Sequence, residues 1–154
     1  VGGIAPEITG QDIFGKPLKL SDFRGKIVLL DFWGDWCGAC RTLYSFNRSL
    51  HQKMAGRQFA LVGVNSDTNR DLTRRIMKNQ QIQWNNFWNG GNRFGEISTQ
   101  WGVKTWPVLY VIDGDGIIQL KSVGGHNRAE ILQLIEKLTA ELDQKQSKST
   151  NNKR

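Results

Sequence analysis

The sequence has 154 residues, 38% of them hydrophobic and 23% charged, which is ordinary for one globular domain and excludes a disordered or fibrous chain. No stretch approaches the roughly 18 consecutive apolar residues of a membrane-spanning helix. The net charge of +7 is spread along the chain, apart from an excess of basic residues after position 142, so the sequence predicts no nucleic-acid site.

Strand and helix patterns alternate in the first half of the chain, which predicts parallel pairing in one sheet. Apolar runs without alternation are typical of strands buried on both faces, and apolar residues at every third or fourth position are typical of helices. Together with glycine and proline at turns, these patterns predict a hairpin over residues 7–20, a turn over 21–25, a buried strand over 26–33, a helix of about five turns over 37–55, a strand over 58–65 and a helix over 69–80 capped by Asp67 or Asn69.

The second half predicts fewer regular elements and a change of composition near its end. The predicted elements are an irregular connection over 84–95, a short helix over 96–101, two antiparallel strands over 108–113 and 117–123 joined by a tight turn, and an amphipathic helix from Asn127. After residue 142 the chain is polar and lacks apolar anchors. The sequence therefore predicts one domain over 1–142 and a disordered basic tail over 143–154.

A pair of cysteines stands where the strand over 26–33 gives way to a helix. They are Cys37 and Cys40, the two cysteines of the chain. Free backbone N–H groups and the helix dipole concentrate positive potential at the start of a helix, which favours a thiolate on Cys37. Cys37 is therefore the candidate nucleophile that attacks a substrate disulfide, and Cys40, one turn further on, is the candidate that resolves the mixed disulfide.

Two other interpretations of the cysteines are buried structural thiols and half of an intermolecular zinc site. The small residues Gly38 and Ala39 let the pair close a strained, reducible ring, which neither alternative requires. We therefore favour a redox-active Cys37–Cys40 disulfide that needs no metal and no other cofactor.

Asp31 lies in the middle of the apolar strand over 26–33. Burying an ionised carboxylate there costs roughly several kcal/mol of folding free energy, unless the group is paired with another polar group or takes up a proton. The functional interpretation is a catalytic proton acceptor and donor for Cys40, because the resolving thiol must lose its proton. The alternative is a structural carboxylate bonded to backbone.

Pro107 opens the strand over 108–113, a position that suits a proline, and it follows Trp106. Trp106 is one of six tryptophans. We expect most of them to pack in the core and a few to form an exposed apolar rim that docks partner proteins.

The segment 31–40 resembles the active-site strand and Trp-Cys-x-x-Cys motif of thioredoxins, most closely the TlpA-like and cytochrome-maturation (AhpC/TSA-related) group. The resemblance covers roughly residues 5–142 and includes the segments 15–26, 65–67 and 108–116. It implies an α/β thioredoxin fold in which helices flank a central mixed β-sheet, with an extra N-terminal β-hairpin.

The same resemblance implies a thiol-disulfide oxidoreductase that reduces or exchanges protein disulfides. Pro107 falls on the cis-proline of the family, and Trp106 before it would offer backbone hydrogen bonds to the substrate chain. The family usually has a smaller residue at the position of Trp106 and a proline at the position of Ala39. The implied substrate-binding residues are Trp36, Gly38, Ala39, Trp106 and Pro107. No histidine beside Cys37 stabilises its thiolate, so we expect a reductant.

The resemblance further implies protein disulfide substrates, an upstream electron donor and a monomer. We expect an exported protein of the periplasm or cell envelope, although the residues themselves leave a cytoplasmic protein open. The first residues have no signal peptide, but a chain that begins with Val1 leaves a removed leader or anchor open.

Two other functions fit parts of the sequence. A peroxidase related to peroxiredoxins would share the outline of the fold, but the sequence lacks the Pro-x-x-x-Thr/Ser-x-x-Cys pattern of those enzymes. A thioredoxin-like binding module would use the aromatic rim and the basic tail to hold a partner, with incidental cysteines.

Overall fold

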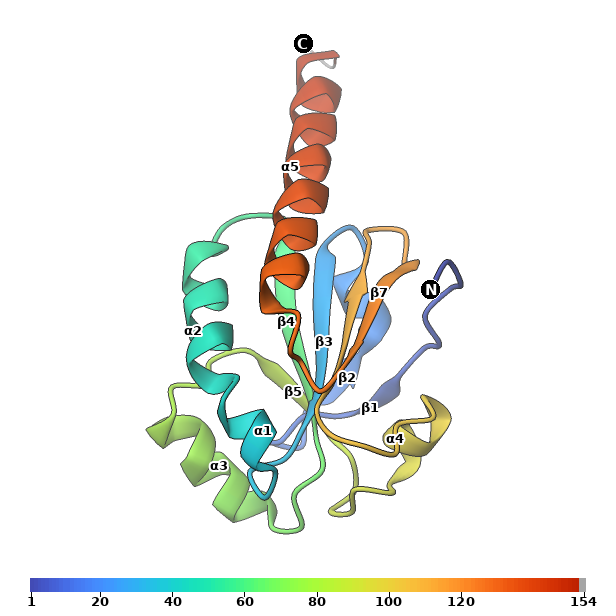
Figure 1. Ribbon diagram of the computed structural model, residues 1–154. Helices are drawn as coiled ribbons and strands as arrows, with labels where there is room; N and C mark the ends of the chain where they lie inside the picture. Colours follow the sequence, from blue (N-terminus) through green and yellow to red (C-terminus); the bar gives the residue numbers. More distant parts are fainter. Residues whose placement is uncertain (153–154) are drawn as a thin grey trace.

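A five-stranded mixed sheet forms the centre of the molecule (Figure 1). The computed structural model describes residues 1–152, and the sheet has the strand order β5-β4-β3-β6-β7, with β3, β4 and β5 parallel and β6 and β7 antiparallel to their neighbours. A two-stranded hairpin, β1-β2, precedes it. The elements are β1 (Thr9–Gln11), β2 (Pro17–Lys19), the 3-10 helix η1 (Leu20–Phe23), β3 (Ile27–Trp33), α1 (Gly38–Arg41), α2 (Tyr44–Lys53), β4 (Phe59–Asn65), α3 (Arg70–Asn79), β5 (Asn85–Trp88), α4 (Glu96–Gln100), β6 (Val108–Ile112), β7 (Ile118–Val123) and α5 (Arg128–Asn152).

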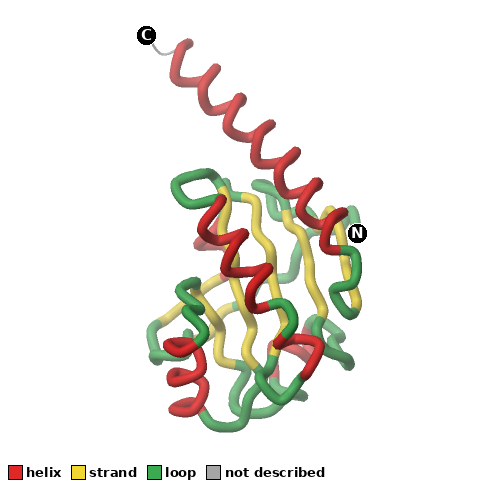
Figure 2. The backbone as a smooth tube through the Cα atoms, turned by 60° about the vertical axis from the view of Figure 1, so that its left-hand side comes forward, coloured by secondary structure: helices red, strands yellow, loops and turns green. Residues whose placement is uncertain are grey.

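Strand β3 is buried along its whole length, and its side chains alternate between two apolar layers. Leu29 and Trp33 belong to the layer that includes residues of α2 and α5, whereas Leu30 and Phe32 belong to the layer beneath the hairpin and α4. Figure 2 shows α2 and α5 on the same side of the sheet. Asp31 has the parity of Leu29 and Trp33 and therefore points toward α2. The mixed sheet, the flanking helices and the N-terminal hairpin confirm the predicted fold class.

The single helix predicted over 37–55 is wrong, because the structure divides it into α1 and α2. At the break, the backbone N–H of Leu43 donates to the carbonyl oxygen of Cys40, three residues back, at 3.0 Å. The hydroxyl of Thr42 also donates to the carbonyl oxygen of Ala39 at 2.6 Å. A side-chain bond of this kind to the preceding turn bends a helix, and α2 then restarts at Tyr44.

The connection predicted over 84–95 contains a strand, β5, which pairs in parallel with β4. Asparagine is depleted in strands, which hid this element from the sequence pattern. Here Asn86 is buried and accepts a hydrogen bond from the indole N–H of Trp33 at 2.7 Å, while its own amide donates to the carbonyl oxygen of Trp84 at 3.0 Å. The buried amide therefore has partners on both sides.

The disordered tail predicted over 143–154 is also wrong as far as Asn152, because α5 continues through these residues. Extending an existing helix adds one hydrogen bond per residue without a new nucleation step, and Gln and Lys favour the helix. Arg57 anchors the start of this part through an ion pair with Asp143 at 3.0 Å. Residues 153 and 154 lie outside the described part of the chain. Within residues 1–152, each helix is too short or too polar to span a membrane.

Replacement of Gly63 tests the packing between β3 and β5. A Cβ atom at this position would collide with Oδ1 of Asn86 and lie 2.8 Å from Nε1 of Trp33. We expect Gly63→Ala to lower the free energy of unfolding by about 3 kcal/mol, because it overpacks the site and breaks a buried hydrogen bond. Urea unfolding measures this change. Gly3→Ala is the control, since nothing lies within 4 Å of its added Cβ, and an equal loss in both variants would contradict the account.

Candidate active site

The two cysteines lie at the carboxyl end of β3, in the turn that begins α1. Cys37 is the N-cap residue of α1, and its sulfur accepts a hydrogen bond from the backbone N–H of Cys40 at 3.1 Å. Both are free thiols, with Cys37 7% and Cys40 1% exposed. Both thiols are buried, and Cys37 is the outer of the two.

The loop before Cys37 is held in place by a buried carboxylate that follows β4. The backbone N–H of Asp35 donates to both carboxylate oxygens of Asp67, at 3.0 and 3.2 Å. The amide of Asn65 donates to Asp67 at 2.7 Å, and the backbone N–H of Asp67 donates in return to Asn65 at 3.1 Å. The sequence predicts Asp67 or Asn69 as the cap of the helix that follows. The structure gives that cap to Asn69, whereas Asp67 holds the loop before Cys37.

The carboxylate of Asp35 joins this loop to α2. It accepts a hydrogen bond from the hydroxyl of Tyr44 at 2.7 Å and lies 3.7 Å from Nε of Arg41. Burial and then the hydrogen bond to Asp35 raise the pKa of Tyr44. Tyr44 therefore stays a neutral donor and keeps α2 against the loop.

Asp31 lies beneath the cysteines and is 5% exposed. Its Oδ2 accepts a hydrogen bond from the amide of Asn47 at 2.9 Å, whereas its Oδ1 and the Oδ1 of Asn47 are buried with no partner. Burial raises the pKa of Asp31 to about 7, and the bond from Asn47 opposes the rise. Across the described residues, no Lys, Arg or His forms an ion pair with Asp31. The carboxyl group is therefore poised to take up or release a proton near neutral pH.

The same surroundings act on Cys40. Burial raises the pKa of its thiol, and the hydrogen bond with Cys37 and the negative charge of Asp31 raise it further. Cys40 is thus held as a protonated thiol next to a carboxyl group that titrates close to pH 7. Asn47 was not among the predicted residues. Asn47 follows Cys40 by seven residues, a spacing that the predicted helix over 37–55 would have put on the same face. That signal could have found Asn47, although the structure divides the helix into α1 and α2.

Trp36 and Trp106, 70 positions apart, meet beside the cysteines. Their ring centroids are 5.5 Å apart in an edge-to-face arrangement. The Trp106–Pro107 peptide bond is cis, and the carbonyl oxygen of Pro107 accepts a hydrogen bond from the backbone N–H of Gly124 at 2.8 Å. Gly38 and Ala39 are exposed on the turn between the cysteines. The structure therefore brings the predicted substrate-binding residues to the same edge of the sheet.

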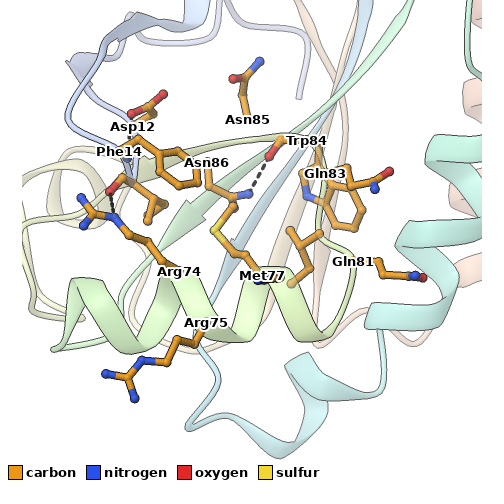
Figure 3. A pocket seen from close by; sticks show the side chains of 13 residues that line it. Asp12, Phe14, Arg74, Arg75, Met77, Gln81, Gln83, Trp84, Asn85 and Asn86 are labelled. Atoms are coloured by element: carbon orange, nitrogen blue, oxygen red, sulfur yellow. Dashed lines mark hydrogen bonds between the residues drawn. The ribbon is translucent and has the colours of Figure 1, made fainter.

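A separate cavity of about 650 Å³ lies between the N-terminal hairpin, α3 and β5 (Figure 3). Met77, Ile82 and Trp84 provide apolar walls, and Arg74 donates to the carbonyl oxygen of Ile13 at 3.1 Å, which ties α3 to the hairpin. None of the predicted site residues lines it. Among residues 1–152, no group of three or more His, Cys, Asp or Glu is placed to hold a metal ion.

Comparisons with known proteins bear on the family and the fold of the chain. The sequence matches the AhpC/TSA family over residues 1–121. Thiol-disulfide oxidoreductase ResA of Bacillus thuringiensis subsp. konkukian (strain 97-27) is 27% identical over 139 residues, which cover 90% of this chain and 79% of that protein. The thioredoxin-like protein YneN of Bacillus subtilis (strain 168) is 27% identical over 135 residues, covering 88% of this chain and 78% of that protein.

Two solved structures give the same result. A Chlorobium tepidum structure described as a thiol:disulfide interchange protein DsbE has a TM-score of 0.80 and 27% identity, covering 90% of this chain and 96% of that one. The thioredoxin domain of a Bacteroides vulgatus thiol-disulfide oxidoreductase has a TM-score of 0.75 and 24% identity, covering 87% of this chain and 96% of that one. This second likeness concerns the fold alone. The chain therefore has the thioredoxin fold and belongs to the AhpC/TSA family.

Proposed function

We propose that this protein is a thiol-disulfide oxidoreductase that reduces protein disulfides through Cys37 and Cys40. The observation that carries the proposal is the pairing of an outer thiol at a helix start with an inner thiol above a buried carboxyl group. The names of the relatives ResA and DsbE support the same chemistry. The proposal needs no cofactor beyond the cysteine pair, and it takes the chain as a monomer.

The reaction proceeds in two exchanges. The thiolate of Cys37 attacks one sulfur of the substrate disulfide, which forms a mixed disulfide and releases the first substrate thiolate. Cys40 then loses its proton and attacks the sulfur of Cys37, which forms the Cys37–Cys40 disulfide and releases the second substrate thiolate. The two released thiolates each take up a proton, so the substrate gains two electrons and two protons. An external dithiol donor returns the Cys37–Cys40 pair to its reduced state.

Asp31 accepts the proton of Cys40 in the second exchange. Burial puts the pKa of Asp31 close to neutral, where a group can both take and return a proton. Asn47 is a positioning residue, because its amide donates to Oδ2 of Asp31 and so favours the ionised carboxylate that acts as base. The unpartnered Oδ1 of Asp31 is free to receive the proton.

The substrate chain binds along Trp36, Trp106 and Pro107, next to the exposed turn of Gly38 and Ala39. Edge-to-face packing of the two indoles keeps them in place before a substrate arrives. Such a protein acts where protein disulfides form, so we assign it to an exported, oxidising compartment.

Covalent trapping tests the cysteine roles. We expect Cys40→Ser, mixed with oxidised insulin, to accumulate a mixed disulfide through Cys37 that dithiothreitol releases, because serine cannot complete the second exchange. Non-reducing gels and mass spectrometry detect the adduct. Cys37→Ser is the matched control and should form none, since Cys40 is 1% exposed. The absence of an adduct with Cys40→Ser would contradict the proposal, and consumption of hydrogen peroxide with a dithiol donor would favour a peroxidase.

The direction of electron flow has its own test. No histidine lies between the cysteines, so the reduced form has no added cation to stabilise it. We expect equilibration with glutathione buffers, followed by mass spectrometry of alkylated protein, to give a reducing potential. A value near about −120 mV, the potential of a strong disulfide-forming oxidant, would rule out the reductase.

Replacement of Asp31 separates stability from activity. Its pKa is 3.8 ordinarily and about 7 in the folded chain. Between pH 3.8 and about 7 the folded chain holds a proton on Asp31 that the unfolded chain has released. The free energy of unfolding therefore falls by about 1.4 kcal/mol for each unit by which the pH rises in this range. We expect Asp31→Asn to be more stable than the wild type at pH 8 and about equal near pH 4. Insulin reduction at pH 7 should fall about 100-fold with the loss of the base.

Two further variants serve as controls for Asp31. Asp115→Asn removes an exposed carboxylate. It should leave the free energy of unfolding at pH 4 and pH 8, and the rate of insulin reduction, as they are in the wild type. Asn47→Ala removes the bond that lowers the pKa of Asp31, so the rise of activity with pH should move to higher pH than in the wild type. An unchanged activity profile in Asn47→Ala would show that Asp31 is a structural carboxylate.

A further inference from the structure

The loop between β5 and α4 places a cation on the aromatic surface beside Cys37. Arg93 lies over the ring of Trp36, with its Cζ atom 5.1 Å from the centroid, and over Phe94 at 5.5 Å. Phe94 in turn packs against Trp106, with centroids 6.1 Å apart. We call Trp36, Arg93, Phe94 and Trp106 the aromatic–arginine patch. Phe94 is 62% and Trp36 44% exposed, so much of the patch faces solvent.

The patch is held rigidly by the buried side chain of Asn89. Its amide nitrogen donates to Ser98 Oγ at 2.9 Å and to the carbonyl oxygen of Asn92 at 3.0 Å, and its Oδ1 accepts from the backbone N–H of Ile97 at 3.0 Å. A Cβ atom at Gly95 would collide with the carbonyl oxygen of Asn89, so the loop closes tightly on this residue. These bonds hold the backbone of the loop that carries Arg93 before any partner binds, which lowers the entropy cost of recognition.

The guanidinium of Arg93 has no acidic partner within residues 1–152, where the ion pairs involve other basic residues. Stacking on indole and phenyl faces leaves the edge of a guanidinium free to donate to a carboxylate in two parallel hydrogen bonds. A pocket of about 690 Å³ adjoins Trp36 and is lined by both Arg93 and Arg41. The carboxylates of Asp35 and Asp67 in this pocket already accept hydrogen bonds from the loop and from Tyr44.

We propose that the aromatic–arginine patch selects protein substrates that carry an acidic residue close to the reacting cysteine. The rings of Trp36, Phe94 and Trp106 contact the apolar part of the substrate segment, and Arg93 binds the Asp or Glu carboxylate beside it. The net charge of +7 attracts such segments from a distance. This inference rests on the proposed reductase function and adds the substrate class.

Three peptide disulfides that differ only in flanking residues test the proposal. Each carries Glu, Gln or Lys on both sides of its cysteine, and kcat/KM for reduction is measured at low and high salt. We expect the wild type to prefer the Glu peptide over the Lys peptide by about fivefold, with the preference shrinking as salt screens the charges. Arg93→Ala should lose most of this preference, and Arg93→Glu should reverse it.

Arg75→Glu is the matched control, because this substitution changes the net charge by the same amount as Arg93→Glu. Arg75 is exposed on α3 and lines the separate cavity of Figure 3. It should keep the preference of the wild type. Equal reduction of all three peptides by the wild type, or equal effects of Arg75→Glu and Arg93→Glu, would overturn the selection by Arg93. Failure of the wild type to reduce any peptide would instead refute the reductase function itself.

Discussion

The burial of the Asp31 carboxyl group beneath Cys40 is the constraint on which the rest of the site depends. Strand β3 is covered on both faces, and its alternation turns Asp31 toward α2. The same strand ends in the loop that leads to Cys37. One run of residues thus brings together a buried carboxyl group, an inner thiol and the slightly more exposed thiol of Cys37. In the proposed reaction, the proton moves between the two inner groups while disulfide exchange takes place at Cys37.

The side-chain partner of Asp31 is the neutral amide of Asn47. A cation in the same place would keep the Asp31 carboxylate permanently ionised. A cation would hold the carboxylate ionised and so make it a weak base, whereas the amide only moderates the effect of burial. The folded chain is less stable at high pH as a result. Residues that reduce stability in this way are common at functional sites, because the reaction needs a group that can change its protonation state.

Local patterns in the sequence were sufficient to predict four of the five strands of the sheet, its flanking helices and the cysteine pair. The apolar run of β3 is confirmed, and the helical spacing after Cys37 does mark helix, although the structure divides it into α1 and α2. Strand β5 was missed because asparagine is depleted in strands, and the partner of the Asn86 carbonyl oxygen, Trp33, lies 53 positions away. Asp67 and the neighbours of Trp36 were missed for the same reason, since the contacts that give them a role join distant segments. The polar end of α5 was mistaken for a tail, because composition alone does not separate a solvated helix from a disordered chain.

The last turns of α5 extend past the sheet, as Figure 1 shows, and residues 144–149 are exposed. With an axial rise of about 1.5 Å per residue, the segment 144–152 extends about 13 Å beyond the packed part of the helix. The backbone bonds of α5 continue through these turns, because extending an existing helix needs no new nucleation step. This end of α5 therefore lies outside the packed core, at the opposite end of the molecule from the cysteines of α1.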